Sequence, residues 1–283
     1  MKYMTKLTLG AMLCTNVVFG ADSQLEMPST VPIDTFKMQE NQIGIGYIQF
    51  SATLELEDDY FEDKIGDAEF KSKGLMVTFP DDSDTIIGKM FEHSYTIGKI
   101  DSELKEKTFV DNGKTYNNTY EKDGYYVGYR PAFSTDIYES DMFKIQNSTS
   151  LHFMLYSIDG SFSVNHNGGG LSSYKYNETT TGLGVKPTTV FNGTFFPINS
   201  LGLTVFGGVS TFLALNYTSY DNGGYDEDAE VTFNMASVDP IYGFDVVFRG
   251  IFSENDSFNL SSVFAVKSAD TSIETIVRYI FTF

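Results

Sequence analysis

The sequence predicts an all-β protein, a transmembrane antiparallel up-and-down β-barrel of ten strands, with twelve strands as the alternative. Apolar and polar residues alternate over segments of roughly 10 residues or more, the length that a tilted strand needs to cross a bilayer. The faces opposite the apolar rows hold mostly Gly, Ser and Thr with isolated charges, which suits a crowded lumen better than the surface of a soluble sandwich. Short and long connections also alternate, as expected when the two rims of a membrane barrel differ.

The composition argues against several other classes of protein. The 283 residues include 25 Phe, 18 Tyr and 25 Gly, which favours strands, and 41% are hydrophobic, too many for a disordered chain. The 38 acidic and 19 basic residues give a formal net charge of −19, so nucleic acid is not an expected partner. After the first twenty residues no apolar run approaches the ~18 residues of a membrane helix.

The first twenty residues predict a cleaved signal peptide. Two lysines precede an apolar stretch over 7–19, and the small residues Gly20 and Ala21 follow it, so cleavage is expected after Gly20. Cys14, the single cysteine, lies in this leader. The mature protein would then have no disulfide or thiolate metal ligand, and we expect no cofactor.

Residues 21–41 contain Pro28 and Pro32 and show no periodicity. They predict a periplasmic tail ahead of a barrel over 42–283. A short plug inserted in the lumen is the alternative for this segment.

Ten segments carry the alternation that predicts strands. They are 43–56, 70–80, 85–100, 124–137, 143–157, 182–196, 201–217, 241–252, 257–267 and 271–283. In the first of them Ile48, Phe50 and Leu54 are out of phase with Ile43 and Ile45, which indicates a bulge. Residues 231–235 could extend neighbouring strands above the membrane, and this is the basis of the twelve-strand alternative.

The connections place both termini on the periplasmic side. The short turns are 80–84, 138–142, 197–200 and 253–257. The long connections are 57–69, 101–123, 158–181 and 218–240, with a short one at 268–270. Because membrane barrels have short periplasmic turns and longer outer loops, the long connections should lie outside the cell.

The last segment, IVRYIFTF, places Tyr279, Phe281 and the final Phe283 on one face. It resembles the C-terminal strand of bacterial outer-membrane β-barrel proteins. The resemblance implies a monomeric barrel in the outer membrane of a Gram-negative bacterium, surrounded by lipid and lipopolysaccharide. It also implies that these three aromatic residues are the signal that the barrel-assembly machinery recognises.

The same alternation directs a set of polar side chains into the lumen. They are Arg130, Asp136, Lys144, His152, Lys186, Asp245, Arg249, Lys267, Glu274 and Arg278. In a narrow ten-strand barrel such groups could pair into a polar plug or line a thin pore. The expected function is a narrow, porin-like channel for ions or small solutes. The alternative is a structural or surface-interaction barrel, adhesin-like or lipopolysaccharide-contacting, with a closed lumen and loops that bind surface ligands.

No catalytic constellation is evident, and we expect no enzyme. The histidines are His93, His152 and His166, and none has the Asp-x-His pattern of the omptin proteases or the His-x-Ser-Asn pattern of the outer-membrane phospholipases. A general base without a positioned nucleophile provides no mechanism.

Two acidic clusters fall in the predicted outer loops. Asp58 and Asp59 belong to one, and Asp226 and Asp228 belong to the other. Carboxylates at this density could bind a divalent cation weakly, but the regular spacing of a calcium loop is absent. A solvated, self-repelling loop is the simpler interpretation, and no specific metal site is expected.

Overall fold

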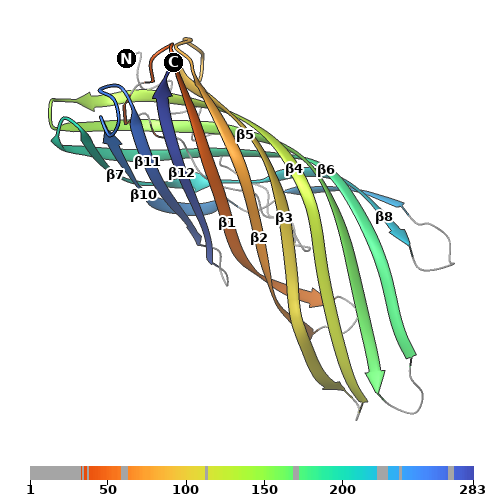
Figure 1. Cartoon of the computed structure of the whole chain (residues 1–283). Coiled ribbons are helices and arrows are strands. Elements are labelled where there is room, and N and C mark those ends of the chain that lie inside the picture. The colour runs from red at the N-terminus through yellow and green to blue at the C-terminus, as the bar shows by residue number, and fades with distance from the viewer. Residues whose placement is uncertain are drawn as a thin grey trace.

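A computed structural model describes most of the chain beyond the predicted leader (Figure 1). The described residues are 33, 35–36, 38–58, 63–111, 114–167, 172–221, 229–235, 238–266 and 271–283. The predicted signal peptide lies outside them. Within these ranges no helix is long and apolar enough to span a bilayer.

The described residues form twelve antiparallel strands in a single sheet. They are β1 Gln42–Asp58, β2 Asp63–Pro80, β3 Lys89–Asp111, β4 Lys114–Glu139, β5 Phe143–Asn167, β6 Ser172–Ile198, β7 Leu201–Ser210, β8 Leu213–Asp221, β9 Ala229–Met235, β10 Asp239–Arg249, β11 Ser257–Val266 and β12 Thr271–Thr282. Pairing of β1 with β12 and of β5 with β6 closes ten of them into a barrel, in the order β1 to β7 followed by β10, β11 and β12. The predicted ten-strand antiparallel barrel is confirmed.

The two further strands continue the line of barrel strands. β7 and β8 pair with β6 in the same register on the two sides of the gap between them, with Thr188 opposite Ser210 and Val185 opposite Leu213. The interruption between them faces Pro187, which has no N–H to donate, and the backbone N–H of Thr211 donates to its carbonyl at 3.2 Å. β9 pairs with β8 as β10 pairs with β7, so the predicted extension over 231–235 is present.

Several segments that we predicted as loops are strands. The β3–β4 hairpin is paired out to Asp111 and Lys114, and the β5–β6 hairpin out to His166 and Ser172. The expected outer loops over 101–123 and 158–181 are therefore mostly β-structure, which forms the long extensions of β3 to β6 in Figure 1. Alternation did not reveal them because a strand outside the bilayer has no lipid-facing side that must be apolar.

The predicted bulge in the first strand is also wrong. β1 pairs with β2 without interruption from Gly44 to Leu56, and the register shifts only after that. Ile48 and Phe50 are buried inside the barrel, whereas Ile45 and Tyr47 are exposed on its outer face. The phase changes because the interior is apolar at this level, which gives β1 two apolar faces.

An apolar cluster fills the interior in the half of the barrel away from the short turns. Its members include Phe50, Phe70, Tyr126, Met154 and Phe212, from five different strands or their ends. Phe50 and Phe70 pack edge to face with ring centroids 5.9 Å apart. Side chains from β1 to β5 and from the segment around Phe212 thus pack into one cluster inside the wall.

The outer surface of the barrel is apolar. Its exposed side chains include Ile45, Tyr47, Leu75, Tyr95, Ile97, Val127, Phe153, Phe191, Leu203, Val205, Tyr242, Phe244 and Phe248. Tyr95, Tyr129 and Phe153 form a row of ring contacts across three neighbouring strands. An apolar surface that encircles a closed sheet is the arrangement required when lipid is the surrounding solvent.

Candidate functional site: the packed lumen

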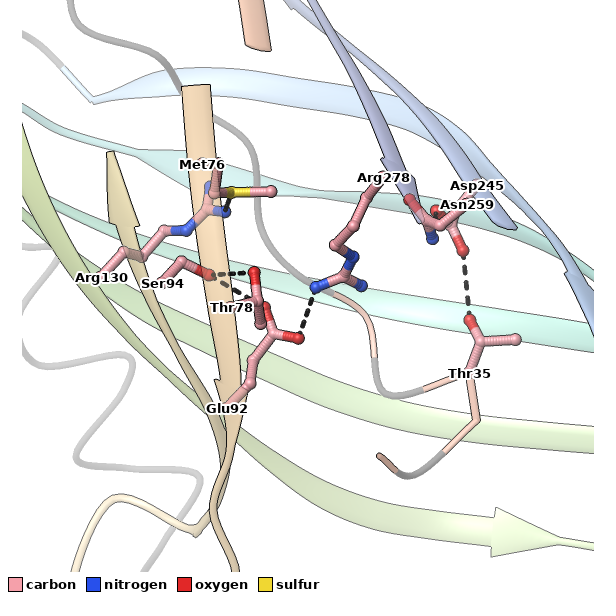
Figure 2. A network of polar contacts seen from close by, with 9 residues as sticks. All are labelled: Thr35, Met76, Thr78, Glu92, Ser94, Arg130, Asp245, Asn259 and Arg278. Atoms are coloured by element: carbon pink, nitrogen blue, oxygen red, sulfur yellow. Dashed lines mark hydrogen bonds and ion pairs between the residues drawn. The ribbon is translucent and has the colours of Figure 1, made fainter. Parts of the chain in front are cut away.

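A buried ion pair crosses the lumen between β3 and β12. Arg278 Nη1 lies 2.7 Å from Glu92 Oε2, with side chains only 8% and 2% exposed (Figure 2). Ser94 donates to Glu92 at 3.4 Å and is within 3.1 Å of Thr78. Further hydrogen bonds help to offset the desolvation of a buried pair, and Ser94 supplies one to the other oxygen of Glu92.

Glu92 was not among the residues that we predicted in the lumen. Its strand has a register shift against β4 between Met90 and Glu92, so Phe91 is the extra residue of a bulge. Bulges re-aim the side chains beside them, and here both Phe91 and Glu92 are buried. The polar residues Glu92, Ser94 and Thr96 alternate in the sequence, and this pattern could have indicated that they face the lumen. The apolar residues before Glu92 interrupt the alternation and make it hard to recognise.

Arg130 lies next to this ion pair. It is buried, it interacts electrostatically with Glu92 and Glu274, and its guanidinium is 3.2 Å from the sulfur of Met76. Figure 2 shows Arg130 and Arg278 extending toward the same region of the lumen from opposite sides. Arg130 thus lies between the Glu92–Arg278 pair and Glu274, which stands opposite Phe50 at the level of the apolar cluster.

A second polar group surrounds Asp245 on β10. Asn259 of β11 donates to Asp245 at 2.6 Å, and Thr35 donates to its other oxygen at 3.2 Å (Figure 2). Thr35 also lies 3.4 Å from Thr204 of β7. A residue ahead of the first strand therefore forms part of the packed interior.

Other residues of the N-terminal segment lie inside the barrel as well. Ile33 and Met38 are buried, and Ile33 packs in a cluster with Val190 and Phe206. Phe36 lies between Phe196, at a ring distance of 5.4 Å, and Arg249, whose guanidinium is 4.5 Å from the ring. At these positions the segment occupies the lumen, which corresponds to the plug alternative and not to a free tail.

An ion pair lies on the other side of the apolar cluster. Lys122 Nζ is 2.7 Å from Glu178 Oε1, although β5 runs between their strands. Gly160 stands between them, and a Cβ there would come within 2.8 Å of the Glu178 side chain. The absence of a side chain at Gly160 lets the pair bridge across β5 above the apolar layer.

The remaining side chains that we directed into the lumen occupy several environments. Lys144, His152, Lys186 and Glu274 are buried, and Arg249 is half-buried. Asp136 is 53% exposed at the rim that carries the short turns, 3.5 Å from Lys144. Its exposure differs from our expectation, because β4 has a register shift between Asp136 and Tyr138 as it ends. Lys267 lies outside the described residues.

The other two histidines lie near the ends of their strands. His93 lies toward the short-turn rim, with Nε2 3.0 Å from Asp81 Oδ2. Partial burial raises the pKa of Asp81, but hydrogen bonds from Ser83 and the nearby His93 outweigh it and hold that pKa below its ordinary value. This stabilising contribution is present above the ordinary pKa and is lost as the pH falls through the lowered one. His166 is in β5, near its end.

No group of three or more His, Cys, Asp or Glu side chains is placed to bind a metal ion in the described part of the chain. Asp58 is the last residue of β1. Asp59, Asp226 and Asp228 lie outside the described residues. The weak divalent site that we considered there stays a prediction.

The layers follow one another along the barrel. The group around Asp245 and Thr35 and the Glu92–Arg278 layer lie toward the short turns, the apolar cluster follows, and the Lys122–Glu178 pair lies beyond it. Glu92 pairs with Arg278 and Lys122 pairs with Glu178, and the apolar layer between these pairs has little to offer a hydrated ion. Within the described residues, the interior side chains of the barrel therefore pack against one another across the lumen.

No protein-family model matches this chain, and no curated protein matches it. Among solved structures, the translocator domain of the autotransporter NalP from Neisseria meningitidis is 11% identical over 87% of this chain and 90% of that chain, with a TM-score of 0.44. The outer-membrane protease OmpT from Escherichia coli is 9% identical over 88% and 99%, with a TM-score of 0.41. The attachment invasion locus protein Ail of Yersinia pestis is 10% identical over 86% and 100%, with a TM-score of 0.31.

At these identities the likeness concerns the fold alone. The class follows from the structure itself: the closed antiparallel wall and its apolar outer face are the architecture of an outer-membrane β-barrel.

Proposed function

We propose that the protein is an outer-membrane barrel with a closed lumen that acts through its outer surface, as a structural or adhesin-like component, and not as an open channel. The observation that carries this proposal is the filling of the lumen by successive layers from residue 33 to the Lys122–Glu178 pair. The extensions of β3 to β6 supply the outer surface that such a role needs. The leader over 1–20 would be removed during export, and no catalytic step is part of this role.

Liposome swelling tests this proposal against the narrow channel. Residues 21–283, the chain without its predicted leader, are reconstituted into liposomes, and an open porin is the positive control. The liposomes are then exposed to small sugars and salts. We expect no solute entry above that of protein-free liposomes, because the lumen is packed. Solute entry that disappears on Arg249→Ala and Arg278→Ala substitution would contradict the proposal and support the channel.

The last strand allows a separate test of whether its aromatic residues are needed for assembly of the barrel in the membrane. Tyr279 and Phe281 stack with ring centroids 6.4 Å apart, and Phe283 is exposed at the end of the chain. If these residues are the signal for the assembly machinery, deleting Phe283 should lower the amount of folded barrel in the outer-membrane fraction several-fold. Phe252→Ala is the matched control, because Phe252 is equally apolar and exposed at a short turn. Equal amounts of both variants would contradict this role of Phe283.

A further inference from the structure

The barrel wall is much lower on one side than on the other. β11 pairs with β10 only as far as Ala265, opposite Ile241, and β12 pairs with β1 only as far as Ser272, opposite Ala52. On one side of this hairpin, β10 reaches higher, to Asp239, and β9 lies above β10. On the other side, β1 reaches higher, to Asp58. The β11–β12 hairpin therefore ends below its two neighbours.

This low hairpin leaves β9 as a free sheet edge. Within the described residues β9 pairs only with β8 and stands last in the strand order of the sheet. One row of its backbone N–H and C=O groups consequently lacks a strand partner. Natural edges are usually protected by Lys, Pro or a bulge, and the sequence of β9, AEVTFNM, contains neither Lys nor Pro.

The position of β9 along the barrel places it outside the lipid. β10 has 11 residues, which at the usual rise and tilt span about 28 Å along the axis, and the apolar band of such barrels is about 25 Å tall. The end of β9 that is nearest to β10 lies at the top of this span of about 28 Å, so β9 lies above the apolar band. Water, not lipid, therefore surrounds its edge.

The outward face of β9 carries apolar side chains, although water surrounds this strand. Val231 and Phe233 are each 68% exposed. Phe233 stands opposite Leu215 of β8, which stands opposite Leu183 of β6, and both leucines are exposed. An apolar row that leads up to an open edge in water marks an interaction surface.

The occupant of this surface must satisfy the edge as well as the apolar row. An acyl chain could cover Val231 and Phe233, but it offers no hydrogen-bonding groups to the backbone, whereas an added strand offers both. The other face of β9 carries Glu230, Thr232 and Asn234, and the whole chain has a net charge of −19. The complementary strand is apolar on one face and basic on the other.

We propose that β9 binds an extended cationic segment of a partner protein by strand addition, with Val231 and Phe233 covered by its apolar residues. This inference rests on the proposed surface role and names its site. It does not depend on what lies inside the lumen.

The test uses the full barrel in phosphatidylcholine nanodiscs and a labelled peptide of about nine residues with alternating Val and Lys, long enough to pair along the whole of β9. A second peptide has the same side chains but carries N-methyl groups on alternate backbone nitrogens, which removes the donors along one edge. Binding is measured by fluorescence anisotropy. We expect the methylated peptide to bind at least about tenfold more weakly, since several backbone hydrogen bonds are lost.

Phe233→Ser and Leu155→Ser form a matched pair of variants. Leu155 is exposed in the same cross-strand row, opposite Leu183, but lies three strands from the edge. Phe233→Ser should weaken binding of the unmethylated peptide several-fold, and Leu155→Ser should leave it unchanged.

Three results would overturn the proposal. Equal affinities of the two peptides would mean that charge alone attracts them, and no binding of either would leave the edge without a strand ligand. If Phe233→Ser and Leu155→Ser changed peptide binding equally, the apolar row would be a lipid contact and not the binding site of the peptide. Liposome permeability is measured separately, so a leaky barrel that binds the peptide contradicts only the closed lumen, and a sealed barrel that does not bind contradicts only strand addition.

Discussion

Replacing Arg278 by leucine is expected to lower the free energy of unfolding of the barrel by about 3–5 kcal/mol. The substitution leaves the Glu92 carboxylate buried without the guanidinium that lies 2.7 Å from it. The remaining arginine of the layer, Arg130, is already shared between Glu92 and Glu274. Urea unfolding in lipid vesicles, followed by circular dichroism of the β-sheet, measures the change.

The double variant Glu92→Gln with Arg278→Leu should recover most of this loss, because it removes both charges together. Lys71→Leu is the matched control at the surface. Lys71 lies 2.9 Å from Glu69, but both side chains are more than 40% exposed, and such pairs contribute ~1 kcal/mol or less. An Arg278→Leu barrel as stable as the Lys71→Leu barrel would show that the lumen layer does not stabilise the fold.

Tyr126→Ala should cost about 3–5 kcal/mol of stability as well, for a different reason. The side chain is 2% exposed, and its ring occupies space left free by two glycines. A Cβ on Gly98 would come within 2.4 Å of the ring, and one on Gly74 within 2.5 Å of the hydroxyl. Removing the ring opens a cavity that these rigid strands cannot close.

The neighbouring residue provides the control for this experiment. Tyr125 is 65% exposed on the outer face, so Tyr125→Ala removes the same group without leaving a cavity. Thermal and urea unfolding of both variants in the same vesicles measures the difference. Equal losses for Tyr125→Ala and Tyr126→Ala would contradict an interior held together by packing.

The strands that cross the membrane could be predicted from sequence because lipid requires one apolar face, and that requirement is visible as alternation. The rule fails where its physical cause is absent. Ile48 and Phe50 appeared out of phase because the interior is apolar at their level, so both faces of β1 carry apolar side chains. Alternation does not predict the extensions of β3 to β6 beyond the bilayer, because neither of their faces meets lipid.

The candidate site was less predictable than the wall. Arg130, Asp245 and Arg278 belong to strands with clear alternation, whereas Glu92 follows a bulge that shifts the phase by one residue. The contact between Thr35 and Asp245 joins residues 210 positions apart, and nothing in the local pattern of a segment without periodicity indicates it. Pairing between strands can be inferred from a repeating pattern, but the packing of an irregular segment against them cannot.

The unequal height of the wall determines how a large molecule can approach the barrel. β5 and β6 have 25 and 27 residues, whereas β11 and β12 have 10 and 12. The tall strands shield the outer mouth from one direction, and the short hairpin leaves a single flank open (Figure 1). For the strand addition proposed at β9, this geometry predicts productive approach from one side only, so the orientation of the barrel relative to its neighbours would control how often a partner reaches β9.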